Sequence, residues 1–441
     1  MARFLVVVVP VTARLWPAVA IGDALAAGGH DVAWCGPESA LRPLVGPDAV
    51  IYPTGRRSYR AFQEVGLAAV RELWDEYVLP LNRFISAPVE RAVADYQPDV
   101  VLADQYALAG ALAAHQHGVR WATLCAGALE LTPPAEGGLR EWVGSRLEQV
   151  REAAGLPADD DLDLLFSPYL VLATTARALI GQTLTGPVPM PDHWVLVGAT
   201  LGPRRTDPGF SWDWWHPGRR HVLVTAGTLS DHLVHDFLAR MMAALEPMAD
   251  RVQVVLNAPA DAMPDPPPHV LVAPRVPMLE LMPRLDAVVC SGGQSTVNEA
   301  LVHGVPLIVA PIRLGELAVA EQVTRAGAGI TVSFAEATPA QLAAAVTAAL
   351  DEPRYRGRAQ QIAEEYAAAG GSAAAAAHLA ALAEAEPALA AGEPALAEAE
   401  PALAGGEPAL AHATAASGPP SRPGLAADRS PLFGPEGADG R

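Results

Sequence analysis

Residues 286–299 read DAVVCSGGQSTVNE, and this stretch decides the fold. Its apolar run at 287–290 is typical of a short buried strand, which stops at the glycine pair Gly292 and Gly293. Ser295 and Thr296 then predict the start of a helix. A strand, a glycine bend and a helix start make an anion site, because the first N–H groups of a helix carry partial positive charge and glycines let a phosphate approach the backbone.

The same alternation of strand and helix recurs along the chain. Residues 3–9 and 31–35 read as strands on either side of an expected helix at 17–28, which places Pro17 in the first helical turn. A second series starts with HVLVTAGT at 221–228. Apolar strands that alternate with helices predict parallel sheets covered on both faces, so we expect an α/β protein with two doubly wound domains and a cleft between them.

Composition divides the chain into four parts. Residues 198–219 are rich in Gly, Pro and Trp and lack periodicity, which predicts a linker between a first domain at 1–197 and a second at 220–383. Residues 384–441 repeat EPALA four times. A proline in every copy opposes a helix and aromatic residues are scarce, so we expect a low-complexity, disordered tail.

Charge and cysteine content exclude several classes of protein. The net charge of −19 argues against nucleic acid and anionic membranes as partners, and the absence of lysine excludes Schiff-base and P-loop lysine chemistry. The first apolar run is too short to span a membrane. Cys35, Cys125 and Cys290 lie in strand-like runs without metal-ligand spacing, which favours buried thiols in a cytoplasmic protein.

Residues 269–321 resemble the donor-binding signature of glycosyltransferases with two Rossmann-like domains, the GT-B architecture. They are most similar to the family-1-type bacterial enzymes that glycosylate macrolides and aromatic polyketides. The resemblance covers most of residues 3–365, although the first half shares the family's rhythm more than its motifs. It implies that the first domain binds the acceptor and the second binds a UDP- or dTDP-linked sugar as substrate, with no other cofactor.

The resemblance also implies roles for single residues. The positions that match the family's diphosphate contacts are Thr228, Ser291, Gly292, Gly293, Ser295 and Thr296. The positions that match the segment around the nucleobase are Arg275, Val276 and Met278. Glu299 matches the carboxylate that holds the ribose hydroxyls, or else it is an ordinary first-turn glutamate.

We expect no metal site. Backbone N–H groups and a helix dipole can stabilise a leaving nucleoside diphosphate without a metal. The only acidic triplet, 159–161, falls in an expected loop, where a solvated role is favoured over metal binding.

The chain departs from the family pattern at three places. Arg14 stands where the family places its catalytic histidine, and Ser291 stands where it places a diphosphate-contacting histidine. Gly315 and Glu316 replace the Asp-Gln pair that contacts the donor sugar, so Glu316 is a candidate to pair with the amine of an amino sugar. A hydroxyl at Ser291 still donates to phosphate, whereas Arg14 stays protonated and cannot act as a general base.

Asp104 matches the aspartate that orients the family's histidine, and it is the candidate base in this chain. An ion pair with Arg14 would make it a poor base. His115 and His117 are weaker alternatives, because an isolated helical histidine is usually structural. Trp16 is a candidate to stack on the acceptor, and Trp212, Trp214 and Trp215 line either the acceptor cleft or the linker.

The leading hypothesis is therefore an inverting, metal-independent glycosyltransferase that moves a hexose or deoxyhexose onto a small, largely apolar natural product. The first alternative is a catalytically degenerate homologue that activates another glycosyltransferase. A nucleotide-sugar epimerase is a further alternative, although the expected cleft is poor in carboxylates and histidines. A homodimer or an auxiliary protein partner stays open.

Overall fold

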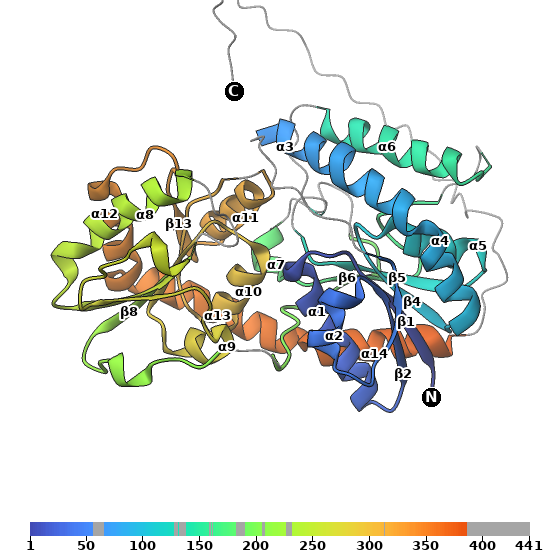
Figure 1. Cartoon of the computed structure of the whole chain (residues 1–441), viewed down its shortest axis with the longest axis horizontal. Coiled ribbons are helices and arrows are strands. Elements are labelled where there is room, and N and C mark those ends of the chain that lie inside the picture. The colour runs from blue at the N-terminus through green and yellow to red at the C-terminus, as the bar shows by residue number, and fades with distance from the viewer. Residues whose placement is uncertain are drawn as a thin grey trace, which may run out of the picture. The chain divides into compact units, whose positions relative to one another are not determined.

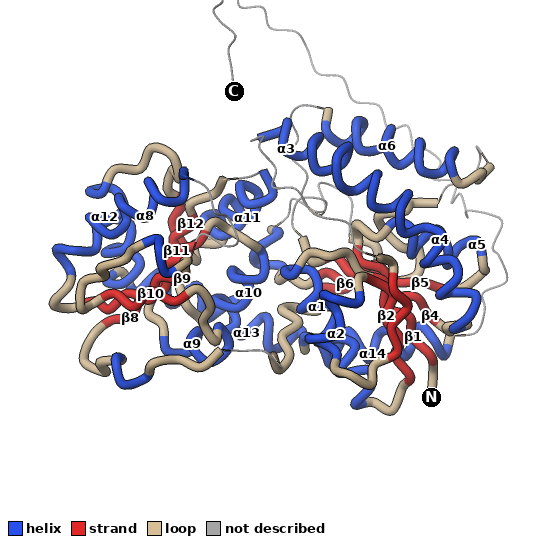
Figure 2. The backbone as a smooth tube through the Cα atoms, in the orientation of Figure 1, coloured by secondary structure: helices blue, strands red, loops and turns tan. Residues whose placement is uncertain are grey.

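The structure is a computed structural model. It describes residues 1–55, 66–127, 131, 138–157, 160, 162–181, 190–204, 208–225, 232–312 and 314–385. The expectations for Thr228, for Asp159 and Asp161, and for the tail beyond residue 385 lie outside these residues. The described part forms two parallel sheets with helices on both faces (Figures 1 and 2), so the expected α/β class with two doubly wound, Rossmann-like sheets is confirmed.

The first sheet has seven strands in the order β3-β2-β1-β4-β5-β6-β7, all parallel. Its strands are β1 (Arg3–Val7), β2 (Asp31–Gly36), β3 (Val50–Pro53), β4 (Val100–Asp104), β5 (Arg120–Cys125), β6 (Val171–Ala173) and β7 (Trp194–Leu196). Its helices are α1 (Thr12–Ala27), α2 (Glu38–Val45), α3 (Gly66–Glu72), a π-helical turn at Leu73–Val78, α4 (Leu79–Tyr96), α5 (Leu108–Gln116), α6 (Leu139–Ala153) and α7 (Arg177–Ile180).

Successive residues of β1 point to opposite faces of this sheet, as the pleat requires. Phe4 and Val6 belong to the core under α1, while Leu5 and Val7 belong to the core under α4 and α5. Figure 1 shows these helices on the two sides of the sheet. A strand buried on both faces has to be apolar throughout, which is why the run at 3–9 is continuous.

The expected start of the first helix was wrong. Helix α1 begins at Thr12, five residues before the predicted start at 17, so Pro17 lies inside the helix. Proline lacks the N–H that would bond the carbonyl four residues earlier, which is that of Ala13. Ala13 O instead accepts a hydrogen bond from Ser295 of the second half, at 2.9 Å. A partner from elsewhere in the fold thus compensates for the missing helical bond.

The second sheet has six parallel strands in the order β10-β9-β8-β11-β12-β13. Its strands are β8 (Arg220–Thr225), β9 (Val252–Asn257), β10 (Val270–Ala273), β11 (Ala287–Cys290), β12 (Leu307–Val309) and β13 (Gly329–Thr331). Its helices are α8 (His232–Leu245), α9 (Met278–Leu281), α10 (Gln294–Val302), α11 (Leu314–Arg325), α12 (Pro339–Asp351) and α13 (Pro353–Ala369), followed by α14 (Gly371–Glu384). Short 3-10 turns lie at Trp212–Trp214, Glu246–Met248, Ala260–Ala262 and Met282–Arg284.

Strand order reverses at one place in each sheet. In the first sheet β1 lies between β2 and β4, and in the second β8 lies between β9 and β11. Ligands of doubly wound folds bind beyond the carboxyl ends of the strands at such a switch point. Asp104 ends β4, and Ser291 follows β11 directly. The topology therefore places the candidate base and the glycine bend at the two expected binding edges.

The tryptophans of the linker pack on the second half of the chain. Trp215 stacks on His221 with 3.6 Å between ring centroids, and the indole N–H of Trp214 donates to Pro268 O at 3.0 Å. Trp212, like Trp214 and Trp215, packs against the core of the second half that contains Val288 and Leu301. Of the two roles predicted for these residues, the structure supports cover of the linker.

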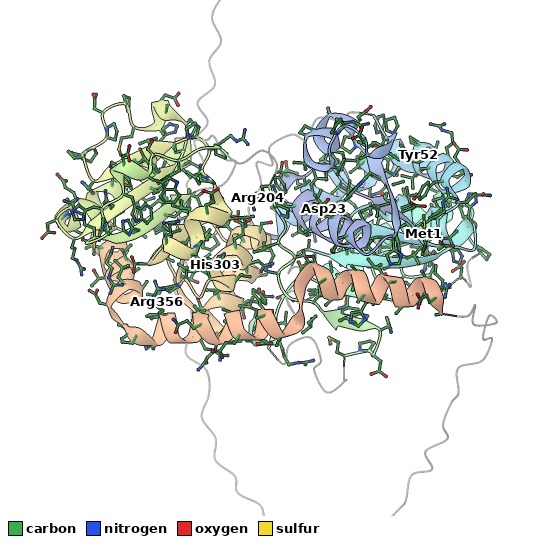
Figure 3. All side chains as sticks on the ribbon, turned by 90° about the horizontal axis from the view of Figure 1, so that it is seen from below. Met1, Asp23, Tyr52, Arg204, His303 and Arg356 are labelled. Atoms are coloured by element: carbon green, nitrogen blue, oxygen red, sulfur yellow. The ribbon has the colours of Figure 1, made fainter. Side chains whose placement is uncertain are left out.

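Helix α14 returns to the first half. Ala375 and Leu379 are buried in the core that contains Phe4 and Val6, although the sequence assigned residues 220–383 to the second domain. Figure 3 shows α13 and α14 as orange ribbons in succession. The alanine-rich sequence of α14 gives the close fit against α1. None of the described helices has both the length and the apolar character needed to cross a bilayer.

Candidate active site

The bend after β11 requires glycine at one of its two positions. Gly292 has φ +96°, and a Cβ there would lie 3.0 Å from both Glu316 O and Val309 Cγ1. Gly293 has an ordinary φ of −58° and is the residue before α10, with open space where a Cβ would point. The chain can thus turn directly from the strand into the helix, with the helix start at the edge of the sheet.

The start of α10 faces the first half of the chain. Besides the bond from Ser295 to Ala13 O, Asn298 Nδ2 donates to Thr174 O at 2.8 Å. Gly293, the N-cap residue, has no side chain that could cap the first turn of α10, which contains Ser295 and Thr296. Backbone N–H groups at an uncapped helix start are suited to bind an anion.

Glu316 organises the loop beside the bend. Its Oε1 accepts from the hydroxyl of Ser291 at 2.9 Å, and its Oε2 accepts from the N–H of Ile312 at 3.0 Å. Two of the residues that depart from the family pattern, Ser291 and Glu316, therefore contact each other. Burial raises the pKa of the adjacent Cys290 thiol to about 12, which leaves it neutral and unreactive.

The segment expected around the nucleobase follows β10, at the edge of the sheet. Arg275 is exposed, Val276 is buried in the core, and Met278 begins α9 half-buried. Because the Val276 side chain is buried, the backbone of this residue is the part that can face a ligand.

Glu299 lies on α10 and is only 3% exposed. It forms an ion pair with Arg204, whose guanidinium also lies 5.0 Å from the ring centroid of Trp16. The Trp16 face that was expected to stack on an acceptor thus contacts Arg204. Figure 3 labels Arg204, which comes from the linker and contacts helices of both halves.

Arg14 and Asp104 form a buried pair. Arg14 Nη1 lies 3.2 Å from both carboxylate oxygens of Asp104, and the guanidinium lies 3.7 Å from the ring centroid of Tyr106. The N–H of Tyr106 also donates to Asp104 Oδ1, at 2.9 Å. The ion pair that would weaken Asp104 as a base is therefore present.

The two candidate histidines lie at the other end of α5 from Asp104. His115 is in the last turn, where its Nε2 lies 3.0 Å from Asp160, and His117 follows the helix. In the part of the chain that the structure describes, no three His, Cys, Asp or Glu side chains are placed to hold a metal ion. All three cysteines are buried thiols.

Known proteins match this chain in sequence, in part and along most of its length. Residues 239–382 match the family model described as erythromycin biosynthesis protein CIII-like, C-terminal domain. The elloramycin glycosyltransferase ElmGT of Streptomyces olivaceus is 29% identical over 385 residues, which cover 82% of this chain and 93% of that protein. The demethyllactenocin mycarosyltransferase of Streptomyces fradiae is 28% identical over 419 residues, 85% of each chain.

Solved structures agree over nearly their whole length. The glycosyltransferase of kitacinnamycin has a TM-score of 0.68 at 23% identity, covering 86% of this chain and 99% of that one. Glycosyltransferase VinC, solved in complex with dTDP, has a TM-score of 0.67 at 21% identity, covering 87% and 99%. These likenesses show the GT-B fold.

The chain is similar to bacterial natural-product glycosyltransferases along most of its length. The resemblance that the sequence predicted is confirmed. Relatives that align along most of the chain match its first half as well as its second.

The first half of this glycosyltransferase contains a cavity of about 590 Å³. Helix α6 forms one wall through residues 140, 143, 144 and 147. The other lining residues include Trp74, Phe166 and Trp194, and two arginines and Asp163 supply the polar groups. Burial raises the pKa of Asp163, which favours its neutral form. The cavity is therefore suited to an apolar, partly aromatic ligand.

Sequence reasoning missed three residues around the first turns of α10. Arg204 and Thr200 come from the linker, which has no periodicity that could point to them. Asn298 precedes Glu299 and accepts hydrogen bonds from Gln294 and Tyr366 at 2.8 Å each. Only Asn298 had a sequence signal, since it lies one turn after Gln294 on the expected helix.

Proposed function

We propose that this chain is an inverting glycosyltransferase that needs no metal. It transfers a hexose or deoxyhexose from a UDP- or dTDP-linked donor to a small, largely apolar acceptor, without a further cofactor. The observation that carries the proposal is the glycine bend, which has a glycine at the N-cap of α10 and a helix start that faces the first half of the chain. Three buried thiols are consistent with a cytoplasmic enzyme.

The donor side stabilises the leaving group. The N–H groups at the start of α10 and the helix dipole favour the negative charge that develops on the diphosphate as the bond to the anomeric carbon breaks. Glu299 is placed one turn further along the helix, where the resemblance puts the ribose. Arg275, Val276 and Met278 follow β10, at the carboxyl end of a strand of the same sheet, where we expect the base.

The acceptor side is the cavity under α6. Trp74 lines it, and the Trp74 ring meets the Tyr106 ring edge-on with 6.4 Å between centroids. Tyr106 in turn lies against Arg14, which holds Asp104. A continuous set of contacts thus links the cavity wall to the buried ion pair. The aromatic lining favours a polycyclic or otherwise flat aglycone.

The Arg14–Asp104 pair favours an acceptor that ionises by itself. Asp104 already accepts from Arg14 and from the Tyr106 N–H, which makes proton removal by this carboxylate weak. A phenol or a carboxylic acid loses its proton to water before transfer. Its oxygen then attacks the anomeric carbon opposite the diphosphate, which leaves with the electron pair, so the configuration inverts. The guanidinium of Arg14 supplies positive charge for the acceptor anion.

The first test is nucleotide binding. Titration calorimetry with UDP, dTDP and GDP should show binding of UDP or dTDP in the micromolar to low millimolar range. Mixed nucleotide sugars with phenolic acceptors should then give a product of inverted configuration by NMR, with the same rate in EDTA. Absence of nucleotide binding at millimolar concentration would sink the proposal.

A second measurement separates the enzyme from an activator of another glycosyltransferase. The buried Arg14–Asp104 pair, which stands where the family's base acts, is the observation that keeps this alternative open. An activator should retain its effect on the partner enzyme when Gly292 is replaced by alanine, whereas an enzyme should lose its own activity.

A further inference from the structure

The linker contacts the same part of α10 that is proposed to bind the nucleotide. Arg204 pairs with Glu299, and the exposed fractions of the two side chains are 11% and 4%. The pair is therefore shielded from solvent, where an ion pair and its hydrogen bonds are strong and the loss of one partner is costly. The linker fits closely here, because a Cβ on Gly202 would lie 3.0 Å from Ala20 Cβ of α1.

Thr200 provides an independent observation. It is 4% exposed, and within the described ranges its hydroxyl oxygen is buried with no hydrogen-bond partner. Most buried polar groups in proteins are hydrogen-bonded, so such a hydroxyl indicates that a ligand or water completes the site. Thr200 lines a small cavity together with Trp16, Thr174, Ser295 and Glu299.

The cavity connects these groups to the bend. Ser295 is in the first turn of α10, and Glu299 lies one turn later on the same helix, so both face one small space. The linker supplies the opposite wall through Thr200 and Leu201. A hydroxyl-bearing group in this space would meet a carboxylate and a threonine hydroxyl at once.

We propose that the linker forms a wall of the donor site, with distinct roles for two of its residues. Arg204 is a positioning residue that pairs with Glu299 and holds its carboxylate at the cavity. Glu299 accepts a hydrogen bond from a sugar hydroxyl of the nucleotide, and the Thr200 hydroxyl donates a hydrogen bond to the oxygen of that same group. This inference rests on the proposed function, since it assumes that the ligand at α10 is a nucleotide with a ribose or deoxyribose.

The test compares UDP with inorganic pyrophosphate. Thr200→Val keeps the shape and removes the hydroxyl, and Arg204→Gln removes the charge. Each should weaken UDP binding about tenfold in calorimetry, because a buried hydrogen bond or charge pair is lost. Pyrophosphate lacks the sugar and should bind both variants as it binds the unaltered protein. Thr200→Ser and Arg204→Lys should restore most of the UDP affinity.

Matched controls separate this role from general damage. Arg251→Gln breaks an exposed arginine–aspartate pair, at 3.0 Å from Asp351, that lies outside the cavity lining. Thr324→Val removes an exposed threonine hydroxyl that bonds Thr331. Both controls should leave UDP affinity unchanged. If Arg204→Gln lowers the thermal midpoint, Thr200→Val, which removes no charge, decides the question.

The outcomes distinguish this inference from the proposed function. Unaltered protein that binds UDP, with Thr200→Val and Arg204→Gln binding equally well, overturns the role of the linker alone. Tighter UDP binding by Arg204→Gln also overturns it, because Arg204 would then compete with the nucleotide for Glu299. Equal weakening of UDP and pyrophosphate means a structural defect and overturns it too. Absence of binding by the unaltered protein overturns both.

Discussion

The hydroxyl of Ser295 donates to the carbonyl oxygen of Ala13, which Pro17 leaves without its usual helical partner. The proline in α1 thus leaves a carbonyl acceptor, and Ser295 in the first turn of α10 donates to it. The contact joins the two halves beside the glycine bend. It places the two helix starts close together, so the positive ends of both dipoles lie near the proposed diphosphate site.

The bend should tolerate alanine at Gly293 and reject it at Gly292. At Gly292 the positive φ and the contacts at 3.0 Å should cost about 1–3 kcal/mol of stability and displace the Glu316 loop. Gly293→Ala meets nothing and should leave the denaturation midpoint unchanged. Chemical denaturation and UDP titration of both variants test this, and equal behaviour of the two would contradict the role of the bend.

The Arg14–Asp104 pair should show strong coupling in a double-mutant cycle. Removal of one partner by Arg14→Leu or Asp104→Leu leaves a buried charge and should cost about 3–5 kcal/mol of unfolding free energy. The double variant should be more stable than either single variant. Strictly additive losses, measured by urea unfolding, would argue against the pair. The exposed Arg251–Asp351 pair is the control and should couple by less than about 1 kcal/mol.

The pH dependence of the transfer rate should follow the pKa of the acceptor's hydroxyl group. With Arg14 in the place of the family's catalytic histidine, the rate with a phenolic acceptor should rise with pH up to the acceptor's own ionisation, at about pH 10 for a simple phenol. Phenols of lower pKa should shift the profile in parallel. Arg14→His puts an imidazole beside Asp104 and should add an inflection to the pH–rate profile at about pH 6.5. An inflection there in the unaltered enzyme, abolished by His115→Gln, would instead identify His115 as the base.

Stability should fall on the acid side of neutrality. Burial lowers the pKa of His303 and of His221 below the ordinary value of 6.5, so their neutral forms are favoured in the folded state. Between the lowered pKa and 6.5 the unfolded chain binds more protons, and stability is therefore lost as pH falls through that window. Denaturation between pH 5 and 8 should show this slope, and His303→Gln should reduce it. An unchanged slope would count against burial at His303.

The cavity under α6 should accept a larger side chain at Gly144. This glycine lines the cavity, and a Cβ there would meet nothing within 4 Å. Gly144→Leu should favour the helix by about 0.5–1 kcal/mol and raise the KM for the acceptor, while donor hydrolysis stays the same. Gly357→Leu, in open space on α13, is the control for the helix effect alone. An unchanged acceptor KM would place the acceptor elsewhere.

Local pattern predicted much of the fold, because doubly wound sheets need strands that are apolar on both faces. The bend at Gly292 could also be predicted, because glycine suits its positive φ. The predicted start of α1 was wrong, because the carbonyl that Pro17 leaves without a helical hydrogen bond accepts one from Ser295, far along the chain. Arg204 could not be found, since its partner is 95 residues away and nothing periodic surrounds it.

The return of α14 to the first half means that the chain crosses between the halves twice, at neighbouring points. The N–H of Gly371 donates to Val197 O at 2.8 Å, which ties the start of α14 to the beginning of the linker. Gly198, Gly370 and Gly371 all have positive φ at this place. A cut in the linker alone would therefore leave the two halves joined, because α14 carries Ala375 and Leu379 into the core of the first half.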